Sequence, residues 1–391
     1  KGTAKRSPIP ADDRAVAEWL AHDEKNMAEN LMITDMVRND LGRVCVPGSI
    51  SVDPLLHVDT YGTVHQMIST VHGELPERVS LFELFSATFP PASITGAPKV
   101  RAMEIIRRNE KSPRGVYTGC IGVFRPGKAF RLNVAIRTLT VCGSRIETGI
   151  GGGIVADSTA ESEWKEALLK RRYAEIAPLP FRIFETIRWT AQDGYADAAA
   201  HIHRAVTSQR YFGRPVDSSA IERGLSGIDA DLRRKGTENA TVKFFLDHRG
   251  NIEFESGPGR GIWRAVPLRV LVSSDRTDAD DVFLHHKTTV RDFYHSRLAA
   301  ARAAGFDEVI FRNTRGEFTE GSISNLFIRR GSRWYTPPLR SGLLPGVERA
   351  HLLASLPAEE KLLFESDLRS ADEILLCNSV RGAGIVAHLS W

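Results

Sequence analysis

A short break rich in proline divides the chain into two parts. It runs Ala177-Pro178-Leu179-Pro180, and prolines at this spacing interrupt helices and strands alike. Both parts alternate helical and strand-like patterns, and a length of 391 residues suggests two or three domains. We therefore predict an α+β chain of two domains, residues 1–177 and 181–391.

The composition excludes several classes of protein. Hydrophobic residues make up 42% of the chain and charged residues 26%, and the net charge is +4, as in ordinary globular proteins. No apolar run reaches the roughly 18 residues that span a bilayer, and no signal peptide opens the chain. We expect a cytoplasmic protein that binds neither membrane nor nucleic acid. Four cysteines without CxxC spacing are expected to be reduced core thiols: Cys45, Cys120, Cys142 and Cys377.

Hydrophobic periodicity locates the elements. In the first part it predicts helices over residues 12–39, 80–89, 97–109 and 158–174, and strands over 63–71, 115–124, 130–141 and 146–155. In the second part it predicts strands over 182–188, 240–247, 268–273, 308–312, 326–329 and 373–377, and a helix over 199–211. The polar stretch 214–236 is predicted to be irregular helix or loop.

Three features of the first part each have two interpretations. Glu163 and Glu166 share one face of a predicted helix. With Glu29 they suit Mg²⁺, which prefers oxygen ligands, or they form a solvated surface. The run Gly149-Ile150-Gly151-Gly152-Gly153 either offers backbone N–H groups to a carboxylate or forms a plain tight turn. Arg137 lies on the polar face of a strand that faces solvent or lines an anion site.

The second part contains a lysine in an unusual context. Lys287 follows the stretch Val282-Phe283-Leu284-His285-His286. Apolar walls lower the pKa of a lysine, as a Schiff-base lysine requires, although most lysines are simply exposed. The histidine pairs His285-His286 and His201-Ile202-His203 suggest either a metal site or a helix surface.

The order of several long motifs in the first part resembles one enzyme family. The motifs are Lys1-Gly2-Thr3, the segment from Ala28 to Arg43, Ser93-Ile94-Thr95-Gly96-Ala97-Pro98-Lys99, Gly115-Val116-Tyr117-Thr118-Gly119, Ala135-Ile136-Arg137-Thr138 and the segment from Gly151 to Ser158. In this order they resemble the chorismate-utilising enzymes. The resemblance implies part of a sandwich of two large antiparallel sheets. The strands that precede Lys1 in that family are expected from a longer chain or another polypeptide.

The resemblance also implies roles for single residues. Glu29 and Glu166 are expected to bind Mg²⁺, with Glu163 beside them as a catalytic residue. His65 is expected near the substrate ring. The residues expected to bind the substrate are Thr95, Gly96, Tyr117, Arg137, Gly151, Gly152 and Gly153.

Lys1 separates the branches of this family. A lysine in Lys-Gly-Thr is typical of the aminodeoxychorismate synthases, where anthranilate synthases have alanine. The lysine is expected to attack the chorismate ring and form a covalent intermediate that ammonia displaces. A glutamine amidotransferase subunit or domain is the expected source of that ammonia.

The second part resembles another family, the fold-type IV pyridoxal-phosphate enzymes. The resemblance is carried by Lys287, the segment from Glu317 to Phe327, Tyr335-Thr336-Pro337-Pro338 and the segment from Gly342 to Arg349. It implies that Lys287 bonds to the cofactor and that Glu320 pairs with the pyridine nitrogen. Leu344 is expected to pack on the ring. The phosphate is expected to be held by Arg204, the backbone of Val347 and Glu348, and Ser379. Enzymes of this type usually form homodimers.

Together the two resemblances imply synthesis of 4-aminobenzoate, a folate precursor. The first domain would convert chorismate to 4-amino-4-deoxychorismate, with Mg²⁺ as cofactor. The second would use pyridoxal 5'-phosphate to eliminate pyruvate. The alternative is an amino-acid aminotransferase of fold-type IV joined to a non-catalytic chorismate-family module.

Overall fold

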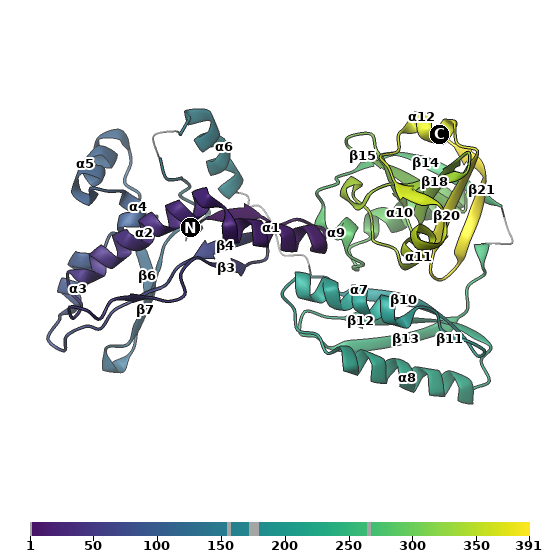
Figure 1. Cartoon of the computed structure of the whole chain (residues 1–391), viewed down its shortest axis with the longest axis horizontal. Coiled ribbons are helices and arrows are strands. Elements are labelled where there is room, and N and C mark those ends of the chain that lie inside the picture. The colour runs from purple at the N-terminus through teal and green to yellow at the C-terminus, as the bar shows by residue number, and fades with distance from the viewer. Residues whose placement is uncertain (1, 155–157, 172–179, 264–266) are drawn as a thin grey trace. The chain divides into compact units, whose positions relative to one another are not determined.

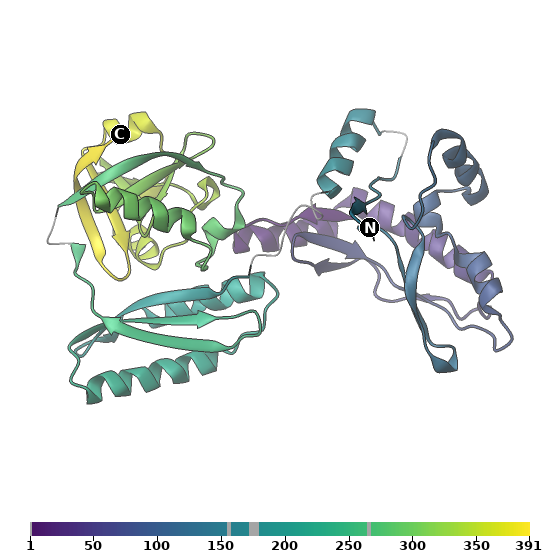
Figure 2. The same cartoon turned by 180° about the vertical axis from the view of Figure 1, so that it is seen from behind.

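The chain forms two compact units (Figures 1 and 2). The computed structural model describes residues 2–154, 158–171, 180–263 and 267–391. The first unit contains the described residues of Lys1–Lys5 and Ala17–Leu179, and the second contains Arg6–Val16 and Pro180–Trp391. The prediction of a two-domain chain of mixed helices and strands is confirmed. No helix in the described ranges is long and apolar enough to cross a membrane.

The first helical region consists of two helices where the sequence pattern predicted one. α1 (Pro10–His22) and α2 (Glu24–Gly42) are separated at Asp23, whose side chain accepts a hydrogen bond from the backbone N–H of Asn26. This is an N-cap, so a new helix begins there. The helices that follow are α3 (Leu81–Thr88), α4 (Ala92–Thr95), α5 (Lys99–Asn109) and α6 (Ala160–Arg171).

The strands of the first unit are short and form several small sheets. β1 (Thr3–Lys5), β4 (Val64–Ile68) and β3 (His57–Thr60) pair in that order. The two-stranded pairs are β2 (Ser51–Val52) with β5 (Val71–His72), β6 (Cys120–Phe124) with β7 (Phe130–Val134), and β8 (Thr140–Cys142) with β9 (Arg145–Glu147). The described residues of this unit therefore do not assemble into two large sheets.

Apolar side chains on these strands are widely exposed. Val123, Phe124 and Val141 are more than half exposed. Two of the cysteines lie on the same strands, and the prediction that all four are core thiols is wrong for them. Cys120 and Cys142 are exposed because the small sheets leave both faces uncovered, whereas the other two cysteines are buried.

The second unit begins with a four-stranded antiparallel sheet in the order β11-β10-β12-β13. The strands are β10 (Ile183–Thr190), β11 (Gly194–Tyr195), β12 (Asn239–Leu246) and β13 (Ile252–Pro258). α7 (Ala198–Tyr211) and α8 (Ser218–Arg234) share a core with β10 and β12 and lie beside the strands in Figure 1. The burial of β10 alternates strictly, so one of its faces belongs to this core.

α8 lies where the sequence pattern predicted irregular helix or loop. Its buried residues Ile221, Leu225 and Leu232, with the partly buried Ile228, follow spacings of four, three and four. These spacings place them on one face of a helix, and Asp217 caps its N-terminus. The prediction is wrong because the apolar stripe of this helix is narrow, and the many polar residues around it hide its periodicity.

Six further strands of the second unit close into a ring. The pairing runs β16-β15-β14-β21-β20-β17, and β17 pairs again with β16. These strands are β14 (Leu268–Thr277), β15 (Glu308–Asn313), β16 (Phe318–Gly321), β17 (Asn325–Arg330), β20 (Glu373–Asn378) and β21 (Gly382–Ser390). β18 (Arg333–Thr336) and β19 (Ala358–Glu360) extend the sheet beyond β17. The ring encloses a buried apolar core that includes Leu268, Val270 and Leu326.

Four α-helices accompany the ring. They are α9 (Val282–His285), α10 (Asp292–Ala303), α11 (Val347–Ser355) and α12 (Glu365–Arg369). Buried side chains of α10, Tyr294 and Leu298, pack with Val309 and Phe311 of β15. α9 precedes Lys287, and α11 begins directly after Gly346. α9 therefore ends two residues before Lys287, and α11 begins at Val347, and both of these residues line the cavity described below.

Candidate active site

In the first unit, the glycine run approaches α6. A Cβ added to Gly152 would lie 3.0 Å from Oε2 of Glu163 and 3.8 Å from Oε1 of Glu166. A Cβ on Gly151 would lie 2.9 Å from the hydroxyl of Tyr117. The structure therefore brings these five residues, which the sequence nominated together, into one neighbourhood.

The acidic residues of this neighbourhood already have partners. Ser158 donates a hydrogen bond to Glu163 at 2.7 Å, and Lys170 pairs with Glu166 at 2.5 Å. Lys170 also donates to the carbonyl oxygen of Gly151 at 3.3 Å. Across the described ranges, no group of three or more acidic, histidine or cysteine side chains is arranged to hold a metal ion. As placed, Glu29 and the two α6 glutamates do not form a Mg²⁺ site.

The remaining nominated residues of the first unit are scattered or outside the described ranges. His65 is buried on β4, and its Nδ1 lies 2.9 Å from the hydroxyl of Thr60. Thr95 ends α4, and Gly96 follows it with a φ of 101°. Arg137 is exposed. Gly153 has open space at its Cβ position, and Lys1 lies outside the described residues.

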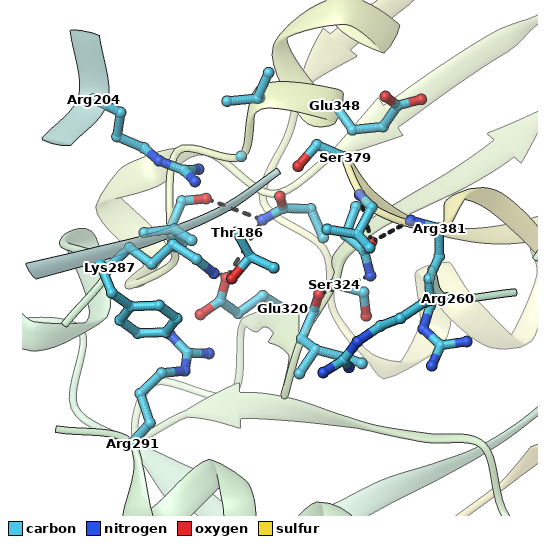
Figure 3. Close-up of a pocket in the computed structure, with 18 of the residues that line it drawn as sticks. Thr186, Arg204, Arg260, Lys287, Arg291, Glu320, Ser324, Glu348, Ser379 and Arg381 are labelled. Carbon is cyan, nitrogen blue, oxygen red and sulfur yellow. Dashed lines mark hydrogen bonds between the residues drawn. The ribbon is translucent and has the colours of Figure 1, made fainter. Parts of the chain in front are cut away.

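The second unit contains a cavity of about 200 Å³ between its two sheets (Figure 3). All seven residues that the sequence nominated for the second site line it: Arg204, Lys287, Glu320, Leu344, Val347, Glu348 and Ser379. They come from β16, α7, α11, the segment before α11 and the segments that follow α9 and β20, most of which are distant in sequence. Only the folded chain brings them together.

Lys287 enters the cavity from a backbone that is held to β10. Its carbonyl oxygen accepts a hydrogen bond from the N–H of Phe184 at 3.0 Å, and Thr288 forms a bridge with Ile183. Its Nζ lies 4.8 Å from the centre of the Phe184 ring. Burial, then repulsion from Arg291 and Arg204, lowers the pKa of Lys287 to about 7. A large fraction of the amine is therefore neutral near pH 7.

Glu320 faces Lys287 from β16 and is almost fully buried. Tyr294 donates to its Oε1 at 3.1 Å, and the N–H of Leu344 donates to its Oε2 at 3.0 Å. Burial raises the pKa of Glu320 to about 7, against the attraction of Arg291 and these hydrogen bonds. The carboxyl group is therefore fixed in position and able to share a proton with a basic ligand atom.

Arg204 is positioned by Glu185, a residue that the sequence analysis did not nominate. Nε and Nη2 of Arg204 donate to the two oxygens of Glu185 at 2.8 and 2.7 Å. His201 hydrogen-bonds to Glu185 at 2.7 Å, and Nη1 of Arg204 donates to the carbonyl oxygen of Pro345 at 2.9 Å. A detectable signal was present, because Glu185 alternates with Ile183 and Ile187 on the apolar face of β10. A charge there requires a buried partner.

The first turn of α11 lies at the same end of the cavity as Arg204. Gly346 is its N-cap, and no side chain caps the helix there. Free N–H groups at a helix start suit an anion, and Val347, Glu348 and Ser379 line the cavity beside them. Burial raises the pKa of the Glu348 carboxyl. Arg204 and α11 together form a suitable phosphate site.

The lining is strongly positive. It contains six lysine and arginine residues, of which Lys243, Arg260, Arg291 and Arg381 were not nominated from the sequence, and two glutamates, Glu320 and Glu348. These four cations lie in segments without a local motif, so only the structure reveals them. A ligand with several negative charges fits this cavity.

Two family models match the chain. The model described as amino-transferase class IV matches residues 182–389, and because this is more than half of the chain, the protein belongs to that family. The model described as chorismate binding enzyme matches residues 1–174. The predicted resemblance of each half is therefore confirmed.

Individual relatives agree with this division. Over 170 residues, 44% of this chain, the first part is 50% identical to aminodeoxychorismate synthase from Streptomyces pristinaespiralis and 46% identical to aminodeoxychorismate synthase component 1 from Escherichia coli. The chain spans 24% and 38% of the length of these two proteins. The chain is also similar to the crystal structure of a suggested amino-acid aminotransferase from Mesorhizobium loti. The match covers 54% of this chain and 99% of the Mesorhizobium loti chain, with 30% sequence identity and a TM-score of 0.50.

The class IV family indicates pyridoxal 5'-phosphate as cofactor, and the residues of the cavity fit it. Lys287 supplies an amine that is neutral in a large fraction of molecules near pH 7, because its pKa is lowered to about 7, and Glu320 supplies a fixed carboxyl. Arg204 and the uncapped start of α11 offer charge and N–H groups to a phosphate. The donor set therefore matches an aldehyde, a ring nitrogen and a phosphate on one molecule.

Proposed function

We propose that the chain takes part in 4-aminobenzoate synthesis. The first domain predicted from the sequence, residues 1–177, would aminate chorismate to 4-amino-4-deoxychorismate, and the second, residues 181–391, would cleave that product to 4-aminobenzoate and pyruvate. One observation carries the proposal: a region about half identical to aminodeoxychorismate synthases shares a chain with a class IV unit whose cavity is strongly positive. The intermediate between the two reactions carries an amine and two carboxylates, which suit that cavity.

In the first unit, we assign the bond-forming step to Lys1. Its amine would attack the chorismate ring as the ring hydroxyl leaves, and ammonia would then displace the lysine. Glu163 would act beside the ring with His65, while Tyr117, Arg137 and the glycine run bind carboxylates. We propose Mg²⁺ binding by Glu29 and Glu166 in the substrate complex. A glutamine amidotransferase would supply the ammonia.

In the second unit, Lys287 would act as the base. Pyridoxal phosphate, when bound, supplies an electron sink for the carbon that carries the substrate amine. Arg204, the start of α11 and Ser379 would hold its phosphate, Glu320 its ring nitrogen and Leu344 its ring face. Nζ of Lys287 would remove the proton from ring carbon 4. The enolpyruvyl C–O bond then breaks, the ring becomes aromatic, and the enolpyruvate gains a proton to become pyruvate.

The second candidate function is amino-acid transamination. It is favoured by the 30% identity of the second unit to the Mesorhizobium loti protein. Transamination would use the same lysine to move a proton on an amino acid and would release a 2-oxo acid without forming an aromatic product. We also propose a homodimer formed through this unit, since class IV enzymes usually build their site at a dimer interface.

The proposal is tested by supplying chorismate, ammonium and Mg²⁺ to the cofactor-loaded protein. Equal amounts of 4-aminobenzoate and pyruvate are expected, and 4-amino-4-deoxychorismate should accumulate when pyridoxal phosphate is removed. Formation of 2-aminobenzoate would reassign the first unit. Conversion of amino acids to 2-oxo acids, with 4-amino-4-deoxychorismate left intact, would reassign the second unit to transamination.

A further inference from the structure

Two arginines meet at one end of the cavity of the second unit, away from the lysine (Figure 3). Arg260 follows β13, and Arg381 lies in the turn between β20 and β21. Nη1 of Arg381 donates to the carbonyl oxygen of Gly261, the neighbour of Arg260, at 3.3 Å. The backbone N–H of Arg381 donates to the side chain of Asn378 at 2.8 Å. The turn therefore holds Arg381 beside Arg260.

The charges of this pair are not neutralised. Within the described ranges, no carboxylate lies in ion-pair distance of either guanidinium, whereas Arg204 at the other end is paired with Glu185. Burial, then repulsion from Arg260 and Arg302, lowers the pKa of Arg381. The carboxyl that attracts it, Glu308, is fully buried and accepts hydrogen bonds from Ser322 and Ser324. Two adjacent like charges in a cavity favour an anion between them.

The two ends of the cavity are electrostatically distinct. Repulsion from Arg291 and Arg204 lowers the pKa of Lys287. Repulsion from a different pair, Arg260 and Arg302, lowers the pKa of Arg381. The amine-bearing carbon of a substrate must lie at Lys287, so a group at the arginine pair must project from the opposite side of the ring. In 4-amino-4-deoxychorismate the ring carboxylate is para to the amine and projects in this direction.

We infer that Arg260 and Arg381 form a clamp for the ring carboxylate of the substrate. The inference rests on the proposed function and deepens it, because the clamp would select a para-amino carboxylate over an ordinary amino acid. Guanidinium groups suit a carboxylate because both are planar and can share two hydrogen bonds. In this account Arg381 is a specificity-determining residue.

The test compares two ligands of nearly the same shape, 4-aminobenzoate and its neutral analogue 4-aminobenzamide, in which an amide NH2 group replaces one carboxylate oxygen. Their dissociation constants are measured by calorimetry on cofactor-loaded wild type, Arg381→Gln and Arg381→Lys. Arg302→Gln is the matched control, because Arg302 repels Arg381 but does not line the cavity. Wild type should prefer the carboxylate. In Arg381→Gln the preference for the carboxylate should fall about 10- to 100-fold. In Arg381→Lys it should fall by a smaller factor, and in Arg302→Gln by less than about threefold.

The outcomes separate this inference from the proposed function. A preference that persists in Arg381→Gln, with the native circular dichroism spectrum, would overturn the clamp even if the enzyme forms 4-aminobenzoate. A preference that falls equally in Arg302→Gln would also overturn it, since general charge would explain the loss. In kinetics, the clamp predicts a raised KM for 4-amino-4-deoxychorismate in Arg381→Gln. Failure of wild type to convert this substrate would refute the proposed function, while the binding ratio still tests the clamp.

Discussion

At the scale of single residues, the second unit depends on charges held inside protein. Burial lowers the pKa of Lys287 to about 7 and raises the pKa of Glu320 to about 7. A lysine must be neutral to bond with an aldehyde, and an ordinary lysine at pH 7 is almost entirely protonated. The surroundings of Lys287 therefore prepare it for reaction before any ligand binds.

The lowered pKa of Lys287 predicts how the rate of cofactor attachment depends on pH. Below about pH 7, Lys287 is protonated and cannot attack; above it, the amine is free. The rate of attachment to pyridoxal phosphate should therefore rise with pH and reach half of its plateau near pH 7. The measurement is the growth of the absorbance of lysine-bound cofactor, in buffers from pH 5 to 10. A midpoint near 10 would contradict the lowered pKa.

Glu185 supports a prediction on stability. Burial alone would raise its pKa, but attraction to Arg204 and hydrogen bonds from His201 and Arg204 lower it from 4.5 to about 2. Its contribution to stability is complete above about pH 4.5 and is lost as the pH falls toward 2. Glu185→Gln leaves Arg204 without its counter-charge and should cost on the order of 3 kcal/mol at pH 7.

Urea unfolding at pH 7 and at pH 3 tests this prediction. The difference between wild type and Glu185→Gln should narrow at the lower pH. Glu253→Gln, on β13 of the same sheet, is the control: its partner Arg182 is exposed, so the effect should stay within about 0.5 kcal/mol. Equal effects of the two substitutions would show that Glu185 does not stabilise Arg204.

Much of the second site could be predicted at this scale. The residues nominated from motifs all line one cavity, although their roles toward a cofactor stay predictions. Arg260, Arg291 and Arg381 could not be found, because an arginine in a loop, a turn or at a helix start has no local pattern, and its function depends on what the fold places beside it. Glu185 could have been found from the apolar face that it interrupts.

At the scale of elements, the start of α11 depends on a close approach of Gly346. A Cβ at this position would lie 1.9 Å from Oδ1 of Asn325. Asn325 in turn donates to the carbonyl oxygen of Leu344 at 3.0 Å. The first turn of α11 can therefore reach the cavity only because residue 346 lacks a side chain.

Gly346→Ala should displace this turn and weaken the binding of pyridoxal phosphate. Overpacking of this kind costs about 1–3 kcal/mol, and we expect cofactor affinity to fall about tenfold or more. The matched control is Gly227→Ala in α8, where a Cβ meets nothing within 4 Å. It should leave affinity unchanged and stabilise the helix by about 0.5 kcal/mol. Equal cofactor affinities in the two variants, measured by fluorescence titration, would contradict the role of Gly346.

Elements could be predicted from the sequence where the apolar pattern is dense. β10, β12 and β20 agree with their predicted ranges to within two residues. The boundary between α1 and α2 was missed because Asp23 acts as a cap through a single side-chain contact within a continuous helical pattern. The strands of the first unit were predicted too long. Thr118 and Arg137 lie inside predicted strands but have positive φ, which interrupts the extended backbone, and the observed strands β6 and β7 do not include them.

At the scale of the whole molecule, we propose that the two units carry separate reactions. Glu166 belongs to the first unit and Lys287 to the second. Glu166→Ala should prevent Mg²⁺-dependent chorismate binding and 4-aminobenzoate formation from chorismate, but not from 4-amino-4-deoxychorismate. Glu161→Ala, an exposed glutamate on the same helix, is the control and should retain both activities. No chorismate binding by wild type and no effect of Glu166→Ala on any activity would instead favour a non-catalytic first unit.

The two-domain organisation was predictable because the proline-rich break separates the motifs of one enzyme family from those of another. The arrangement of strands in the first unit was not, because the expected large sheets require pairings between distant segments that periodicity does not encode. In the described residues those strands pair only as small sheets. In the same described residues no group of acidic side chains is arranged to hold a metal ion, so Mg²⁺ binding by the glutamates stays a prediction.

The most direct test of the account is the conversion of 4-amino-4-deoxychorismate by protein loaded with pyridoxal phosphate. Wild type should release 4-aminobenzoate and pyruvate in equal amounts, and Lys287→Ala should release neither. Lys235→Ala, an exposed lysine on the second unit, should match wild type. No product from a wild-type protein that shows the absorbance of lysine-bound cofactor would contradict the lyase assignment.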